Sequence, residues 1–190
     1  MPETNGNNVA NVTTGKPKVG GAVYRAPAGT AAPTDAKTEL PSAFKCLGYV
    51  SDEGVTNANT RETEEIKAWG GDTVANPQTS KTDTLQMTLI EFMNVEALKA
   101  YFGDENVSGT LETGIHIKSN SGELERAVWV VEMIAAGDYP HRYVIPDGKV
   151  TETEDISYVD NDVAGLGLTI TAYPDANGDT HHQYIGGTAD

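Results

Sequence analysis

The chain has 190 residues, and 13 Lys and Arg stand against 28 Asp and Glu, which gives a formal net charge of −15. That length fits one domain with appendages. The acidity argues against a nucleic-acid-binding protein, which needs Lys and Arg to displace counterions from phosphates. The longest apolar run, residues 127–131, is too short for a transmembrane helix. Residues 1–12 lack the basic and apolar regions of a secretory signal, so we expect a cytoplasmic origin.

The N-terminal third predicts an arm followed by two strands. Residues 1–18 are polar and rich in Asn, Thr and Gly, so they predict an N-terminal arm that does not order by itself. Strands are predicted at 19–24 and 44–50, with a loop rich in Ala, Pro and Thr over 26–42.

The single cysteine, Cys46, excludes an internal disulfide and a CxxC zinc site. Its apolar neighbours predict a buried thiol.

Residues 51–82 are polar and show no sustained period of 2 or 3.6, which predicts a long irregular loop. The loop contains Trp69, and an indole is costly to expose to water unless something covers it. Two interpretations remain open: Trp69 is buried within its own subunit, or it anchors a protein–protein interface, where Trp is enriched. Gly70 and Gly71 favour a backbone turn, because a phosphate-binding loop would need a following Lys-Ser/Thr and a helix.

One helix is predicted after a strand at 84–90, in which apolar and polar residues alternate. The helix covers 95–102, with Asn94 as its N-cap and Gly103 just beyond its end. At about two turns it is too short to be stable alone, so it must dock on a sheet. The residues that share its apolar face are Val95, Leu98 and Phe102.

The second half of the chain predicts mainly strands. A hairpin is predicted over 111–134, and further strands follow at 142–145, 150–158, 166–173 and 181–185, with a turn at 146–148 and a hairpin turn at 175–179 that would pair the last two strands. With roughly seven to nine strands and one short helix, the sequence predicts a mainly β fold. The expected architecture is a β-sandwich or barrel over residues 19–185, followed by a short C-terminal tail over 186–190.

No catalytic, cofactor or metal site is predicted. His181 and His182 stand near Asp175 and Asp179 and could be drawn as a metal site. Adjacent residues of a strand point to opposite faces, however, so the two histidines do not easily share one ion. The spacing in 175–179 also differs from that of a calcium-binding EF-hand loop, which favours a simple turn.

Three segments together resemble the major tail (tail tube) protein of bacteriophages with long, non-contractile tails. They are residues 65–74 followed by 79–84, residues 89–107 (a strand that runs into the helix) and residues 168–178. They occur in the family's order, span most of residues 20–185, and contain no catalytic signature. The fold of this family recurs in the tube of bacterial type VI secretion. Residues 26–42 match no motif of the family.

The resemblance implies a structural protein, not an enzyme, without a cofactor. Family members form hexameric rings that stack into a hollow tube, which surrounds a tape-measure protein and conducts DNA without binding it specifically. The expected partners are other copies of the chain, the tape-measure protein, the tail terminator and distal tail or baseplate proteins, with no membrane contact. The expected location is the virion tail, assembled in the cytoplasm of the bacterial host.

Within such a tube, the arm and the long loop are expected to contact neighbouring subunits and to order on stacking. The loop residues proposed for these contacts are Trp69, Gly70, Gly71 and Asp72. The acidic charge suits a channel wall that repels DNA and lets it slide. Glu112 and Glu123, in the predicted hairpin over 111–134, are candidates for the channel lining. The alternative places them on the outer wall or between subunits.

A different class of protein remains open as the alternative function. A β-sandwich binding module, such as an adhesin or a carbohydrate-binding domain, would place exposed aromatic side chains on a flat face. Many of the aromatic residues here fall at strand-interior or helix-face positions, which favours the tube subunit.

Overall fold

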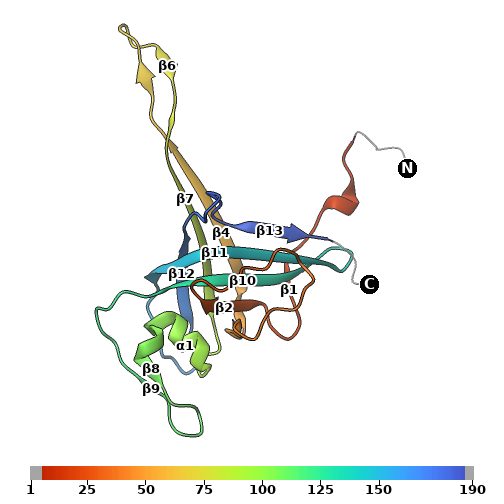
Figure 1. The fold of residues 1–190 in the computed structure, drawn as a ribbon, viewed down its shortest axis with the longest axis vertical. Coiled ribbons are helices and arrows are strands. Elements are labelled where there is room, and N and C mark those ends of the chain that lie inside the picture. The colour runs from red at the N-terminus through yellow and green to blue at the C-terminus, as the bar shows by residue number, and fades with distance from the viewer. Residues whose placement is uncertain (1–5, 187–190) are drawn as a thin grey trace.

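The computed structural model describes residues 6–186, so residues 1–5 of the arm and 187–190 of the C-terminal tail lie outside the described part. Most strands belong to one antiparallel sheet of nine strands in the order β3-β2-β10-β11-β12-β7-β4, with β1 beside β10 and β13 beside β11 (Figure 1). These strands are β1 (Lys16–Pro17), β2 (Val23–Pro27), β3 (Lys45–Cys46), β4 (Val50–Thr63), β7 (Gln78–Leu89), β10 (Arg126–Ala135), β11 (Tyr139–Thr153), β12 (Leu166–Ala172) and β13 (His182–Ile185).

Two small ribbons and three short helical elements complete the described chain. The ribbons are β5 (Ile66–Lys67) with β6 (Thr73–Ala75), and β8 (Val107–Ser108) with β9 (His116–Ile117). The α-helix α1 covers Val95–Phe102, and 3-10 turns occur at Val9–Asn11 and Asp104–Asn106. The protein is therefore mainly β, with one short α-helix in residues 6–186, as the sequence predicted.

The central strand β10 is apolar on both of its faces, so the sheet needs a cover on each side. Trp129 and Val131 point into the main core, which also contains buried side chains of β7, β12 and α1. Val128 and Val130 point the other way and pack with Val144 in a second, smaller cluster. Alternate residues of one strand therefore join two separate cores.

Residues 28–43, which include most of the segment 26–42 that matched no family motif, cover the second face of the sheet. The buried Arg142 holds this cover in place, because its guanidinium donates hydrogen bonds to the carbonyl oxygens of Asp35, at 2.7 Å, and Thr38, at 2.8 Å. The same guanidinium pairs with the buried carboxylate of Glu132, so neither charge is left unpaired. The loop is therefore a fixed part of the fold.

The helix α1 has the bounds that the sequence predicted. The side chain of Asn94 accepts a hydrogen bond from the backbone N–H of Glu96 at 3.0 Å, which is the expected N-cap interaction. Gly103 ends the helix with a φ of 99°, a conformation that favours glycine. Leu98 is almost fully buried in the main core, while Val95 and Phe102 are partly buried against it.

The prediction of an irregular loop over residues 51–82 was wrong. β4 and β7 continue to pair well beyond the body, as far as Thr63 opposite Gln78, and form a long hairpin that projects from the sheet (Figure 1). β5 and β6 form its outer end. An exposed two-stranded ribbon buries neither face, so its sequence lacks the alternation from which half-buried strands are recognised.

The predicted hairpin over 111–134 does not form. β9 contains only two residues and pairs with β8, and residues 118–125 have no strand before β10 begins. Leu111 is 65% exposed, so the alternation that suggested a strand does not reflect burial there.

The turn predicted at 146–148 lies inside β11, which runs without a break from Tyr139 to Thr153. The indole N–H of Trp129 donates to the carbonyl oxygen of Gly148 at 3.2 Å. A Cβ on Gly148 would lie 2.8 Å from the Trp129 ring, so a side chain cannot fit here without a shift. The glycine therefore permits close packing of Trp129 instead of marking a turn.

Candidate inter-subunit surface

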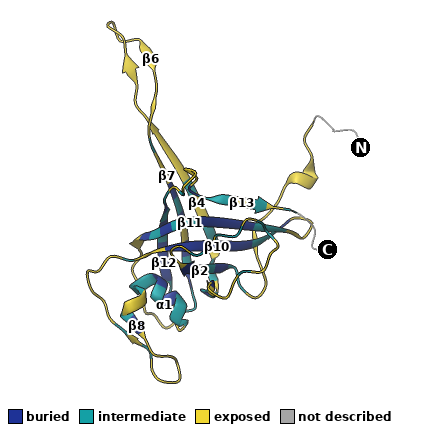
Figure 2. Cartoon of the chain, in the orientation of Figure 1, coloured by how far each residue is buried: buried dark blue, intermediate teal, exposed yellow. Residues whose placement is uncertain are grey.

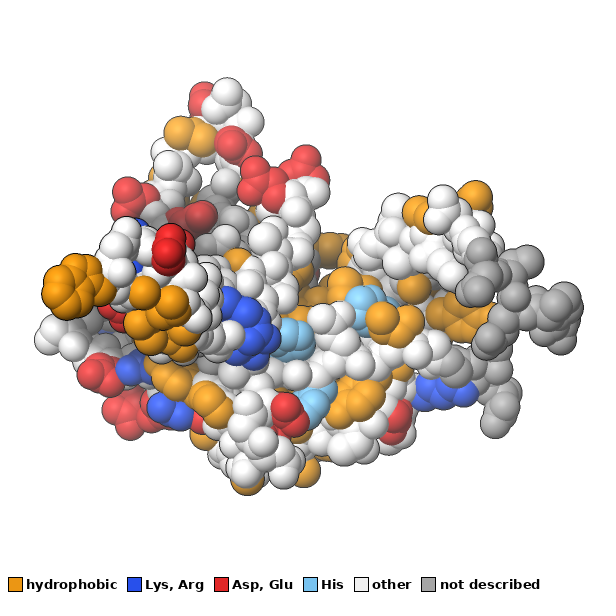
Figure 3. Space-filling model, turned by 90° about the horizontal axis from the view of Figure 1, so that it is seen from above, with side chains coloured by type: hydrophobic (Ala, Val, Ile, Leu, Met, Phe, Trp, Pro, Cys, Tyr) orange, Lys and Arg blue, Asp and Glu red, His pale blue; other side chains and the backbone are white. Residues whose placement is uncertain are grey.

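The projecting hairpin is the part of the described chain with the least support from its own subunit. Figure 2 colours its outer half almost entirely as exposed. Three apolar side chains lie near its end: Ile66 is 51% exposed, Val74 is 62% exposed, and Trp69 is fully exposed. Figure 3, which looks down on this end of the molecule, shows hydrophobic side chains at the end of the projection. A tryptophan in this position is typical of a contact with another protein.

The four residues Trp69–Asp72 form the turn at the hairpin's end. The backbone N–H of Ala68 donates to the carbonyl oxygen of Asp72 at 2.8 Å, and the N–H of Gly71 donates to Ala68 at 3.0 Å. Gly70 and Gly71 have φ values of 111° and 98°, which other residues rarely adopt. The turn directs Trp69 away from the body, so the interpretation that Trp69 is buried within its own subunit is wrong.

A buried carboxylate fixes the root of the hairpin. Asp83 of β7 accepts hydrogen bonds from the side chains of Asn57 on β4, at 2.7 Å, and Thr180, at 2.6 Å. The ring Nδ1 of His181 is hydrogen-bonded to the same carboxylate, and Asn57 also donates to the hydroxyl of Tyr143, at 2.9 Å. Asp83 therefore joins both hairpin strands to β11 and to the segment before β13.

The charge of Asp83 is retained despite its burial. Burial alone would raise the pKa of Asp83, but hydrogen bonds from Thr180, Asn57 and His181 outweigh this effect and hold the pKa below its usual value. The sequence did not single out this residue, because its partners, Asn57, Thr180 and His181, lie far from it along the chain. The last strand also pairs with β11 instead of β12, the neighbour that the turn at 175–179 had suggested.

The histidine–aspartate group near the C-terminus is best explained as a turn. Asp175, Asp179 and His182 offer ligand atoms within 4.8 Å of one another. Asp175, however, already accepts the backbone N–H groups of Asp179 and Asn177, at 3.0 and 2.7 Å, and these bonds lower its pKa. His181 faces Asp83 instead, as expected for the neighbour of His182 in an extended chain.

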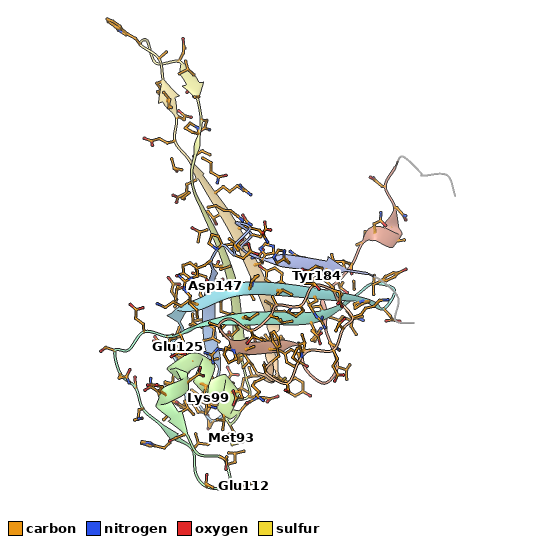
Figure 4. The ribbon with its side chains drawn as sticks, in the orientation of Figure 1. Met93, Lys99, Glu112, Glu125, Asp147 and Tyr184 are labelled. Carbon is orange, nitrogen blue, oxygen red and sulfur yellow. The ribbon has the colours of Figure 1, made fainter. Side chains whose placement is uncertain are left out.

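The two carboxylates proposed for the channel lining lie apart from the hairpin. Glu112 is in the exposed connection between β8 and β9, at the end of the molecule opposite the hairpin (Figure 4). Glu123 precedes β10 and pairs with Lys149 at 2.7 Å, which lowers the pKa of Glu123. They do not share a hairpin, so the geometric reason for grouping them was wrong.

The remaining candidates occupy ordinary structural positions. Cys46 is only partly buried, and its sulfur accepts a hydrogen bond from the backbone N–H of Gly48 at 3.4 Å. In residues 6–186, no helix has the length and apolar character required to cross a membrane.

These features define a class of structural β protein in which one folded body carries a long hairpin with an apolar end. The sequence matches the family model described as phage tail tube protein over residues 6–189, and the chain therefore belongs to this family. Among solved structures, it resembles the tube-terminating cap of the anti-feeding prophage, determined by cryo-EM, with a TM-score of 0.51 and 9% identity. The alignment covers 98% of this chain and 100% of the cap chain, and at this identity it shows a shared fold. No curated protein matches the chain.

The chain is thus a structural subunit of a phage tail tube and a component of the virion tail. The family consists of structural proteins, not enzymes. Family membership also decides against the alternative of an adhesin or carbohydrate-binding module.

Proposed function

We propose that six copies of this chain form a ring, and that rings stack into a hollow tube that holds the tape-measure protein and later conducts DNA into the host. The observation that carries this proposal is the projecting hairpin with the fully exposed Trp69 at its end. An isolated two-stranded ribbon is marginally stable in water, and an exposed indole gains free energy when a partner covers it. A subunit that stacks on others supplies such a partner.

The hairpin turn is the proposed contact between subunits, through Trp69, Gly70, Gly71 and Asp72. The N-terminal arm is a second contact segment. Its described residues 6–15 are all exposed, and the arm is tied to the body where the Thr13 hydroxyl accepts a hydrogen bond from the Ala136 N–H at 2.7 Å. Both segments extend away from the sheet and would order fully against neighbouring copies.

The composition supports the proposal of a negatively charged channel. Each subunit carries a formal charge of −15, so the wall of a ring would repel DNA instead of binding it. Glu112 remains a candidate for the lining. Glu123 is a weaker one, because its pairing with Lys149 offsets part of its charge.

The proposed partners are further copies of the chain, the tape-measure protein, a tail terminator at one end and distal tail or baseplate proteins at the other. Assembly would take place in the host cytoplasm. In a tube of rings stacked in one orientation, the two ends present different surfaces. Different capping proteins can therefore bind at each end.

Negative-stain electron microscopy of the concentrated protein tests this proposal. We expect rings with sixfold symmetry or stacks of such rings. Particles that remain monomeric at every concentration and salt condition would contradict it.

A further inference from the structure

A groove lies at the end of β4 that is farthest from the hairpin tip. Its volume is about 850 Å³, and residues 18–22 line one side of it while residues 49–55 line the other. Apolar side chains inside it include Val50, Val55 and Met133. It is thus large enough to accept an aromatic side chain with several neighbouring residues, and its lining offers apolar contacts.

The backbone on one side of the groove is not fully paired. β4 pairs with β7 at Val50 opposite Leu89 and again at Val55 opposite Met87, so residues 51–54 have no partner on β7. Backbone N–H and C=O groups without ladder partners at a sheet edge are a template for binding another chain.

One residue of the groove lining has a buried polar atom without a partner. Within residues 6–186, the Ser51 hydroxyl is the one buried side-chain polar atom that makes no hydrogen bond. Leaving such a group unpaired costs about 1–3 kcal/mol, and native structures contain few of them. The oxygen is closed off from the groove, so it marks imperfect packing behind residues 51–54 and not a hydrogen-bonding position for a partner.

We propose that this groove receives the hairpin tip of a second copy, with Trp69 as the inserted side chain; the inference rests on the proposed tube function. β4 has 14 residues, which corresponds to a strand length of about 45 Å. The groove lies at its first residues and the tip lies beyond its last, so the tip cannot reach the groove of its own chain (Figure 1). Each copy therefore has one tip and one groove at opposite ends, an arrangement that produces open-ended stacking.

The chemistry of the two surfaces fits this pairing. Burial of an aromatic side chain removes about 150–250 Å² from water, and Trp69 is fully exposed in the single subunit. The indole N–H needs an acceptor once it is buried, and the backbone carbonyl groups of residues 51–54, which have no partner on β7, offer one. Ile66 and Val74, next to the tip, add apolar surface.

The charges of the two surfaces give the contact a recognisable salt dependence. The tip carries Glu64, Glu65 and Asp72 with Lys67, and the groove carries Asp52, Glu53 and Glu91 with Lys18. Both surfaces are therefore net negative and repel each other at long range. Salt shortens the Debye length from about 10 Å at 0.1 M to about 3 Å at 1 M, so assembly should strengthen as salt is added.

The native Cys46, which lines the groove, allows a direct cross-linking test. An Ala68→Cys variant places a second thiol beside Trp69, and a short bis-maleimide is added to assembled tubes. The matched controls are Thr60→Cys, on the exposed shaft of the hairpin, and Ala68→Cys combined with Cys46→Ser. If Ala68→Cys does not assemble, Asp72→Cys on the other side of the turn replaces it.

We expect a ladder of covalent dimers, trimers and longer chains from Ala68→Cys, at least tenfold more abundant than from either control. Normal tubes in which Ala68→Cys, or Asp72→Cys in its place, cross-links no more than Thr60→Cys would overturn the groove assignment while the tube function stands. Absence of tubes from the unmodified chain would overturn both. Assembly that weakens as salt rises would also contradict the assignment.

Discussion

The body and the hairpin use the same secondary structure for opposite purposes. In the body, β10 and β12 bury most of their side chains, and residues 28–43 cover the second face and are held there by the buried Arg142. In the outer hairpin, almost every residue is exposed, and the apolar side chains point into solvent. The body buries most of its own apolar surface, whereas the hairpin leaves its apolar side chains exposed, and we propose that another chain covers them.

The boundary between the two regions is sharp and lies at Asp83. Outward from it, β4 and β7 pair only with each other, while inward β7 also pairs with β12. Substitutions inside this boundary should therefore change the stability of the subunit, and substitutions outside it should change assembly alone.

The largest expected effect on the body comes from Leu98→Asp. The change removes a buried leucine and places an unpaired carboxylate in the main core, so it should destabilise the subunit by more than about 4 kcal/mol. The measurement is thermal unfolding followed by circular dichroism. An unchanged melting temperature would show that α1 does not support the core.

At the boundary, Asp83→Asn should cost about 2–3 kcal/mol, because an amide cannot accept all the bonds that the carboxylate accepts from Thr180, Asn57 and His181. The pKa of Asp83 is lowered in the folded state, so its charge contributes stability above the unfolded pKa of about 3.9. That contribution is lost as the pH falls through the folded pKa.

Urea unfolding of both chains across pH tests this point. The stability difference between the native chain and Asp83→Asn should shrink below about pH 4, as the carboxylate becomes protonated. A difference that does not shrink below about pH 4 would contradict the role assigned to the carboxylate.

On the hairpin itself, Trp69→Ala should change the free energy of unfolding by less than about 0.5 kcal/mol. The indole is fully exposed and makes no buried contact within its own subunit. It should still abolish stacking. Unfolding in urea and sedimentation of assemblies measure the two effects separately. A clear loss of subunit stability would mean that the indole packs within its own chain.

The smallest effect on the subunit is expected from Glu112→Lys combined with Glu123→Lys. Both residues are exposed, so folding and tube formation should persist. If they line the channel, DNA ejection from assembled virions should slow, and added salt should restore it. Normal ejection at every salt concentration would place both residues outside the channel.

Burial explains which parts of the fold could be predicted from the sequence. The helix at 95–102 was predicted with correct bounds because its cap and its apolar face are local signals. β12 was recognised because it is buried. Gly148 was misread as part of a turn, because only the three-dimensional packing shows that Trp129 occupies the space above it.

The candidate surface could be predicted only in part, for related reasons. The sequence indicated Trp69, because a tryptophan in a polar stretch is costly to expose to water unless a partner covers it. The hairpin that carries it was missed, because a ribbon that is exposed on both faces has no hydrophobic period. The groove and the Asp83 network combine residues far apart in the chain, so no sequence window contains them.

The claim that the hairpin serves assembly and not folding is tested most directly by removing its end. Residues 64–77 are replaced by Asn-Gly, a two-residue turn that can join Thr63 to its partner Gln78. The account predicts an unchanged melting temperature and particles no larger than single rings by electron microscopy, while the native chain forms tubes. Normal tubes from the shortened chain, or a shortened chain that fails to fold, would contradict it.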